Sequence, residues 1–220
     1  MNQDVLRGEL WAAYAAGALD PAMSLLIETQ AGVAAPAARI LGMAEAVSGA
    51  MFESETPAPL RADALERVLA KIANEPAEAA AMRAASDRND LFLAEISTLP
   101  AVLQDAAIRT LARRKWKRPT LGLRVLELEI ESPGKAELIR IEPGLSIPKH
   151  THEGREYTLV LTGAFTDETG RYGVGDVSFA DPGVKHRPRA EPGEVCWNLA
   201  VTYGALKWTG ALGLVQRFLN

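Results

Sequence analysis

The sequence contains very little cysteine, which limits the ways in which the fold can be stabilised. Cys196 is the one cysteine among 220 residues, so no disulfide can form within the chain. Disulfides are common in oxidising compartments and rare in the cytosol. A single cysteine in a chain of this length is therefore typical of a protein from a reducing compartment.

The sequence also has no long hydrophobic run. Its first ten residues, MNQDVLRGEL, include an early acid and no apolar segment of the kind found in secretory signals. The alanine-rich stretches are interrupted by Glu28, Arg39 and Glu45, so none reaches the roughly 20 apolar residues of a membrane span. We therefore expect a cytoplasmic protein with no membrane partner.

There is no strong excess of charge of either sign. The formal net charge of -4 does not indicate a nucleic-acid-binding protein or an acidic tail. One segment, RTLARRKWKRP at residues 109–119, has six basic residues, no acid, and Trp116 among them. It could contact nucleic acid or an acidic partner, or it could be a solvated helix end that leads into a linker. We favour the second interpretation and expect no direct binding to nucleic acid.

The two halves of the chain have different periodicities, and the change falls near residue 119. The first half is rich in Ala, Leu, Glu and Arg, which favour helices. Asp20 is a predicted N-cap, and Pro21 is the predicted first helical position after it. Further helices are predicted over residues 35–52, 60–74 and 101–114. Residues 75–99 give no clear pattern.

The second half alternates apolar and polar residues in short segments that are separated by Gly, Pro and Asp turns. The predicted strands cover residues 123–131, 136–142, 157–163, 176–180 and 195–202. Several short strands at near-regular spacing predict a β-sandwich or β-barrel. We therefore predict an α+β protein with a helical unit (1–75), a helical linker (76–118) and an antiparallel β-barrel (119–220).

All three histidines lie in this second half. On a strand, His150 and His152 point to the same face. Glu156 returns to that face if the strand continues past a bend at Gly154, and His186 follows a predicted strand and turn that could bring it back beside the others. Three imidazoles and one carboxylate suit a divalent first-row metal. We therefore predict these three histidines and Glu156 as metal ligands, although Glu156 could instead be a general base.

The spacing of these residues resembles the cupin superfamily. The first cupin motif, G(x)5HxH(x)3–4E(x)6G, is matched at Gly144, His150, His152, Glu156 and Gly163. The second motif is matched more loosely, at Gly175, Pro182, Gly183 and His186, and it lacks the final Asn. The resemblance implies a double-stranded β-helix, or jelly-roll, barrel with one divalent metal inside. Zinc suits the resemblance best, and iron, manganese and nickel also take this ligand set.

A longer stretch resembles a narrower family, the ChrR-type anti-sigma factors. It reads HTHEGREYTLVLTGAFTDETGRYGVGDVSFADPGVKHRP, and the helical half opens similarly, with LWAAYAAGALDPAMSLLIETQ. Such proteins join a helical zinc-binding anti-sigma domain to a carboxy-terminal cupin. They hold an extracytoplasmic-function sigma factor inactive and release it under oxidative or photooxidative stress. The resemblance implies a transcriptional regulator with such a sigma factor as partner and a cupin that senses a stress signal or a small-molecule ligand in the barrel.

The helical half departs from this family where zinc ligands are expected. The family opening continues into HxxxCxxC, whereas this chain reads QAGVAAPA and places Gln30, Ala34 and Ala37 at the three ligand positions. Alanine has no ligand atom, and glutamine is a poor zinc ligand. We therefore predict no structural zinc in this half. The sigma-binding surface either survives without zinc or has acquired another role.

Three questions stay open at this point. A metal-dependent cupin enzyme, such as an oxygenase, isomerase or hydrolase, is the alternative to a regulator, because a fold and a ligand set do not fix a function. Cys196 is expected to be inert packing in a strand, and an oxidisable sensor near the metal is the alternative. Exposed barrel edges could also pair to form a homodimer.

Overall fold

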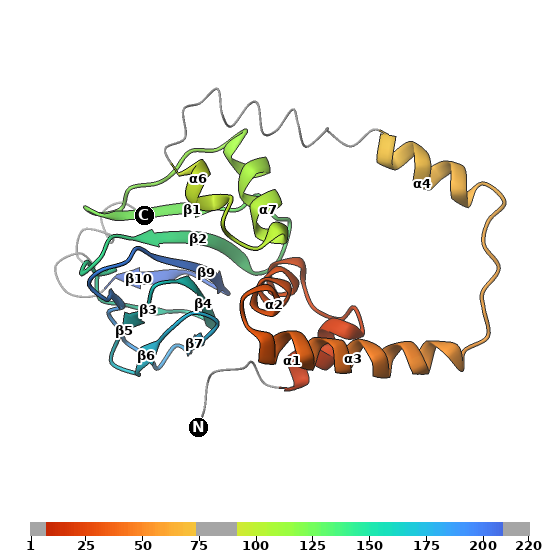
Figure 1. Ribbon diagram of the computed structural model, residues 1–220, viewed down its shortest axis with the longest axis horizontal. Coiled ribbons are helices and arrows are strands. Elements are labelled where there is room, and N and C mark those ends of the chain that lie inside the picture. The colour runs from red at the N-terminus through yellow and green to blue at the C-terminus, as the bar shows by residue number, and fades with distance from the viewer. Residues whose placement is uncertain (1–7, 74–91, 209–220) are drawn as a thin grey trace.

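The computed structural model describes residues 8–73 and 92–208, in which helices come first and strands follow (Figure 1). The helices are α1 (Gly8–Ala15), α2 (Pro21–Val33), α3 (Ala35–Glu53), α4 (Ala64–Ala73), α6 (Leu93–Ile96) and α7 (Ala101–Leu111). The strands are β1 (Leu123–Glu127), β2 (Lys135–Ile141), β3 (His150–His152), β4 (Glu156–Thr162), β5 (Phe165–Thr166), β6 (Arg171–Tyr172), β7 (Val177–Ala180), β8 (Arg189–Ala190), β9 (Cys196–Thr202) and β10 (Leu206–Trp208). This order confirms the α+β prediction.

The start of α2 follows the local signals in the sequence. The side chain of Asp20 accepts hydrogen bonds from the backbone N–H groups of Ala22 and Met23, and Pro21 is the first helical residue, as predicted. The predicted helices 35–52, 60–74 and 101–114 correspond to α3, α4 and α7, with ends that differ by a few residues. None of the helices within residues 8–73 and 92–208 combines the length and the apolar character needed to cross a membrane.

The strands form one large sheet and two small ones, and all their pairings are antiparallel. The large sheet has the order β1-β2-β9-β4-β7, and the small sheets are β10-β3 and β6-β5-β8. The large sheet contains all five of the strands predicted from alternation, whereas the other strands have only two or three residues. The small sheets lie across from the large sheet and complete the predicted antiparallel barrel (Figure 1).

The large sheet buries both of its faces, and the faces serve different purposes. Leu138 of β2 and Leu199 of β9 join the core that the sheet shares with the helices, which includes Leu26 of α2. The next residue along β2, Ile139, lies in a second core inside the barrel. Because side chains alternate along a strand, the same strands attach the helical half and line the barrel interior.

Polar contacts also join the helices to the barrel. Asp20, the N-cap of α2, accepts hydrogen bonds from Ser132 (2.6 Å) and from the Tyr203 hydroxyl. On the same side of the sheet, the buried guanidinium of Arg140 pairs with Glu95 of α6 at 2.9 Å, and the Trp197 indole N–H donates to the same carboxylate. The helical half is thus held to the sheet by apolar packing and by these directional bonds.

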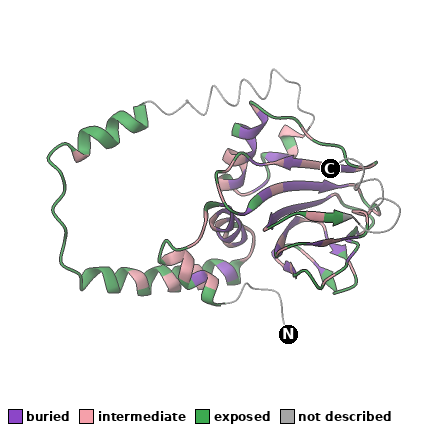
Figure 2. Ribbon diagram, turned by 180° about the vertical axis from the view of Figure 1, so that it is seen from behind, coloured by how far each residue is buried: buried purple, intermediate pink, exposed green. Residues whose placement is uncertain are grey.

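The helix α4 and the second half of α3 extend away from this core (Figure 1). Both are largely exposed (Figure 2), and α4 contains no buried residue. Their exposed side chains include large apolar residues, namely Met43, Val47, Met51 and Phe52 on α3 and Leu65, Val68, Leu69 and Ile72 on α4. The two segments are helical and yet leave much of their apolar surface uncovered within the described chain.

The basic segment at residues 109–119 is engaged with the protein itself. Arg114 and Lys117 both pair with Glu127 of β1, at 3.3 and 2.6 Å. Trp116 packs edge-on against Phe92, with ring centroids 5.7 Å apart. These contacts favour the interpretation of this segment as a helix end and linker over a nucleic-acid contact.

Candidate metal centre

The structure brings the four predicted metal ligands together inside the barrel. His150 and His152 form the two ends of β3, Glu156 begins β4, and His186 forms a β-bridge with His150. All four side chains are buried, and one potential ligand atom from each lies within 4.8 Å of the others. Within residues 8–73 and 92–208 this is the one group of three or more His, Cys, Asp or Glu that could hold a metal ion.

The distances within this cluster suit a single ion. The Nε2 atoms of His152 and His186 are 3.1 Å apart, and they lie 3.6 and 3.9 Å from the two carboxylate oxygens of Glu156. Donor atoms bonded to one ion at about 2.1 Å lie about 3–4 Å from one another. The cluster therefore has the donor set and the spacing of a divalent metal site, and its use as one stays a prediction.

A second layer of groups orients these side chains. The Nδ1 atom of His150 lies 2.8 Å from the carbonyl oxygen of Pro148, and Nδ1 of His186 lies 2.8 Å from the carboxylate of Asp167. Glu156 accepts hydrogen bonds from the Thr158 and Thr202 hydroxyls. Bonds of this kind fix the tautomer and ring orientation of a metal-binding histidine.

Asp167 was not predicted from the sequence. It lies in the DETG turn after β5, 19 residues before His186, and only the folding of the small sheets brings the two together. No motif spacing relates them. The available signal was an acid in the turn of a β-hairpin, between β5 and β6, which is too common to single out one residue.

The electrostatic environment favours the metal-binding form of the imidazoles. Burial lowers the pKa of both His150 and His152 to about 4 and raises the pKa of Glu156. Burial also opposes the ionisation of Asp167, but hydrogen bonds from His186 and Thr169 hold its pKa below the ordinary value. At neutral pH, His150 and His152 are therefore uncharged and keep a lone pair for a cation.

We expect the metal-free protein to lose stability as the pH falls from 6.5 towards 4. In this window the unfolded chain binds protons at His150 and His152, whereas the folded protein does not, so their stabilisation is complete above pH 6.5 and lost near pH 4. The raised pKa of Glu156 has the opposite effect on the free energy of unfolding, because the folded protein binds this proton more tightly than the unfolded chain does. One such group does not offset two histidines. Urea unfolding in EDTA should show a loss of about 1–2 kcal/mol between pH 6.5 and pH 5.

The control for this pH dependence is the double variant His150→Asn, His152→Asn. It keeps polar side chains at both positions and removes both titrating groups. Its unfolding free energy should not fall over the same pH range, because the raised pKa of Glu156 then acts without the two histidines and in the opposite direction. An unchanged pH dependence in the double variant would show that other groups cause the loss.

We expect Asp167→Asn to weaken metal binding by about 10–100-fold, the range found for partners of metal-binding histidines. The amide keeps the size of the side chain but removes the negative charge beside Nδ1 of His186. Competition with a chromophoric chelator measures the affinity. Asp181→Asn, in an exposed turn of the barrel, is the matched control and should bind the metal normally. Equal affinities for both variants would contradict a positioning role for Asp167.

The positions that replace the zinc motif lie where α2 and α3 meet the barrel. The Gln30 amide donates to the carbonyl oxygen of Gly175 at 2.9 Å. Ala34 packs closely on Gly175: a Cβ atom added at Gly175 would lie 2.9 Å from the Cβ atom of Ala34. Ala37 is fully buried. The two alanines provide no ligand atom, and the small side chain of Ala34 allows the helices to approach the barrel.

Cys196 is held in the barrel core and away from solvent. Its side chain is fully buried, and burial raises the pKa of the thiol to about 11. Its hydrogen bonds are long contacts with the Asn198 amide, at 3.4 and 3.6 Å. Because the thiolate is the reactive form of cysteine, this environment favours inert packing over an oxidisable sensor.

Comparison with known proteins covers both halves of the chain. A family model described as the ChrR cupin-like domain matches residues 104–206. The anti-sigma-E factor ChrR of Cereibacter sphaeroides is 36% identical over 212 residues, which cover 96% of this chain and 95% of that protein. The crystal structure of Rhodobacter sphaeroides SigE in complex with the anti-sigma ChrR contains a chain with 34% identity and a TM-score of 0.66, and the match covers 90% of this chain and 97% of that chain. The similarity extends over both halves, and this chain belongs to the ChrR family of anti-sigma factors.

Proposed function

We propose that this protein binds an extracytoplasmic-function sigma factor in the cytoplasm through α3 and α4 and holds it inactive. The single observation that carries the proposal is the uncovered apolar surface of these two helices. Family membership supports it, because the ChrR relative of known structure is seen in complex with the sigma factor SigE. The two relatives that match both halves of the chain are anti-sigma factors, which favours a regulator over the enzyme alternative.

The apolar residues of α4 follow a helical pattern. Leu65, Val68, Leu69 and Ile72 are spaced as i, i+3, i+4 and i+7, which places them on one face. All four are more than half exposed. An amphipathic helix with an uncovered apolar face is the form in which helices enter a hydrophobic groove of a partner.

The end of α3 presents a second apolar surface. Met43, Val47 and Met51 recur every fourth residue, so they lie along one side of the helix. Each is at least 63% exposed, whereas Ile40 and Leu41, one turn earlier, pack against the core. The same helix therefore anchors in the protein at one end and offers apolar surface at the other.

We further propose that the barrel holds one divalent ion, with zinc as the best candidate, on His150, His152, Glu156 and His186. As zinc, such an ion would supply a Lewis-acid site that exchanges ligands; only a redox-active metal such as iron or manganese in the same ligand set would itself react with an oxidant. Burial holds the imidazoles of His150 and His152 neutral, and the contacts with Pro148 and Asp167 orient those of His150 and His186. The family resemblance makes a stress signal or a small molecule at this site the input of the regulator.

The path from the barrel to the helices is short. Gly175, which accepts the Gln30 hydrogen bond, donates its own N–H to the carbonyl oxygen of Val160 in β4. Glu156 begins the same strand. A change at the metal site that shifts β4 would therefore reach α2 through Gln30, and α2 packs against α3.

The experiment is co-expression of the full chain with each extracytoplasmic-function sigma factor of its host, followed by size-exclusion chromatography and elemental analysis. One sigma factor should co-elute at one-to-one stoichiometry, and the chain should carry about one divalent ion. His152→Ala should lose the ion. No stable complex with any sigma factor would contradict the regulator, and a well-folded chain free of metal would contradict the metal site.

A further inference from the structure

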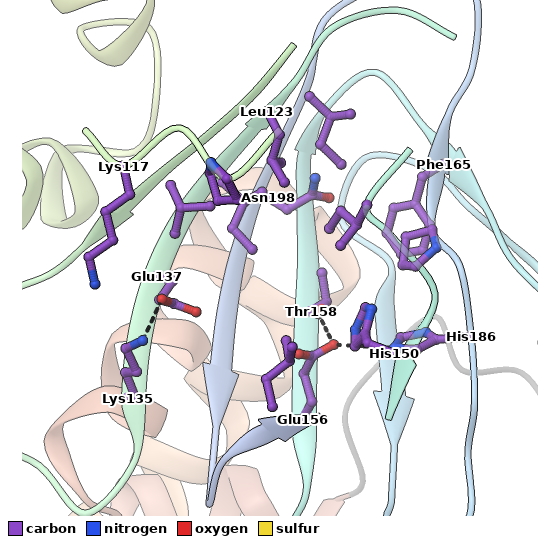
Figure 3. Close-up of a pocket in the computed structure, with 17 residues that line it drawn as sticks. Lys117, Leu123, Lys135, Glu137, His150, Glu156, Thr158, Phe165, His186 and Asn198 are labelled. Carbon is purple, nitrogen blue, oxygen red and sulfur yellow. Dashed lines mark hydrogen bonds and ion pairs between the residues drawn. The ribbon is translucent and has the colours of Figure 1, made fainter. Parts of the chain in front are cut away.

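The barrel encloses a cavity of about 260 Å³ that adjoins the metal-ligand cluster. His150, Glu156 and His186 form one end of it, and Lys135 and Glu137 lie on the side away from the histidines (Figure 3). The cavity is smaller than the roughly 300–1,000 Å³ of pockets that take drug-sized ligands. The polarity of its wall and the charges at its two ends limit which molecules it can bind.

Most of the wall is apolar. Leu123 and Val125 of β1, Ile139 and Ile141 of β2, Ile147 and Phe165 contribute to it. Thr158 also reaches the cavity, but its hydroxyl is used in a hydrogen bond to Glu156. A polyhydroxylated occupant would leave its hydroxyl groups without partners on these walls, and each buried unpaired group is costly. An apolar body fits the cavity, and a sugar does not.

One neutral polar group interrupts the apolar wall. Asn198 of β9 is 2% exposed, and its amide lines the cavity between the two ends (Figure 3). Within the described chain its side chain contacts one hydrogen-bonding partner, the Cys196 thiol. A thiol is a weak donor and a weak acceptor, whereas an amide has two N–H donors and a carbonyl acceptor. Asn198 therefore has hydrogen-bonding capacity for one polar group of an occupant.

The charges at the two ends indicate a single carboxylate. A divalent ion with neutral imidazoles and the Glu156 carboxylate carries one net positive charge in its ligand set. The Asp167 carboxylate lies behind His186 and is not among the residues that line the cavity, so the ion would present its positive side to an occupant, which favours an anion. At the other end Lys135 pairs with Glu137 at 2.6 Å, and Lys117 pairs with Glu127 at 2.6 Å. The positive charges there are balanced, and no arginine is among the described residues that line the cavity. A phosphate or a second carboxylate would find no unpaired cation among them.

We infer that the cavity binds a small monocarboxylate with an apolar body, with its carboxylate at the histidine end and one hydroxyl or carbonyl group at Asn198. This inference rests on the proposed metal site and names the class of ligand for it. The ligand would be the small-molecule input of the regulator.

Isothermal titration of the zinc-loaded full chain tests the class of ligand. Octanoate and gluconate each carry one carboxylate, and they differ in whether the body is apolar or hydroxylated. Octanoate should bind at least tenfold more tightly than gluconate, and EDTA treatment should remove its binding. At least one hydroxyoctanoate of a positional panel should bind more tightly than octanoate, and Asn198→Leu should abolish that advantage.

Variants of the wall test the location. Val125→Phe and Ile147→Phe each fill the cavity and should lower octanoate affinity at least tenfold while zinc content stays at the wild-type level. Val174→Phe is the control: it makes the same Val-to-Phe change as Val125→Phe, but at an exposed position of the barrel. It should bind octanoate normally. If both filled variants bind octanoate as the wild type does, or if gluconate binds as tightly as octanoate to zinc-loaded protein, the inference is wrong while the metal site stands. Failure to take up zinc at all would contradict the metal site, and with it the charge argument for a carboxylate.

Discussion

The double variant Leu65→Asn, Leu69→Asn should lower the affinity of the chain for its sigma factor by about a thousandfold or more. The two leucines lie one turn apart on the apolar face of α4, and both are more than half exposed. Truncation of a residue at the centre of an interface costs about 2 kcal/mol or more. Two such losses in one groove, together with two buried amides that lack partners, account for a reduction of this size. Surface plasmon resonance with the purified sigma factor measures it.

The structure provides a matched control on the same helix. Glu66→Asn, Lys71→Asn introduces the same two side chains at neighbouring positions of α4 and leaves the net charge unchanged. Both double variants lower helix propensity by a similar small amount. The control should retain affinity within a few-fold of wild type. Similar losses in both variants would show that α4 acts through its helicity and not through its apolar face.

Neither variant should alter the rest of the protein. No residue of α4 is buried, so the core that joins α2, α7 and the large sheet is untouched. Thermal unfolding and metal content should therefore match the wild type for both. Such a result separates the proposed partner surface from the proposed metal site, which lies on the other side of the large sheet from the helices.

The sequence predicted the metal-ligand cluster because its signal is local. His150 and His152 are related by the two-residue period of a strand, and Glu156 follows within a spacing that the cupin resemblance covers. His186 had no such period; a predicted strand and turn before it could bring it back, and the second cupin motif also includes it. Asp167 and Asn198 could not be predicted, because their contacts depend on how the small sheets and β9 close the barrel. The roles of these residues are set by tertiary packing.

For the helices too, the sequence predicted where an element lies but not what covers it. Helix α4 was predicted over residues 60–74 from composition, and the structure confirms it as Ala64–Ala73. Its pattern could not show whether another part of the chain covers the apolar face. The predicted strand 123–131 ends at Glu127, because the chain turns at Ser132 and Gly134 to enter β2. Element type followed from the sequence, whereas ends and partners required the fold.

Gly154→Ala should lower the free energy of unfolding by about 3 kcal/mol, the upper end of the usual cost of overpacking, because the added methyl group meets backbone rather than a movable side chain. Gly154 lies within HTHEGRE, between the two histidines of β3 and Glu156 of β4. A Cβ at this position would overlap the carbonyl oxygen of Tyr203. The Tyr203 backbone N–H donates to the Arg155 carbonyl at 2.8 Å. The turn therefore cannot move away from Tyr203 without breaking this bond. Urea unfolding of the purified variant measures the loss.

The consequences of Gly154→Ala should extend to both functions of the chain. A shift of the turn separates His152 from Glu156, so metal affinity should fall together with stability. Tyr203 also donates its hydroxyl proton in a hydrogen bond to Asp20, the N-cap of α2, so the displaced turn loosens the contact between barrel and helices.

Gly49→Ala, on the exposed part of α3 with nothing within 4 Å of the new methyl group, is the control and should stabilise the protein by about 0.5–1 kcal/mol. Wild-type metal affinity and stability in Gly154→Ala would contradict this account. The expected result would show that the glycine between the histidines and the glutamate closes the metal site and holds the helical half in place.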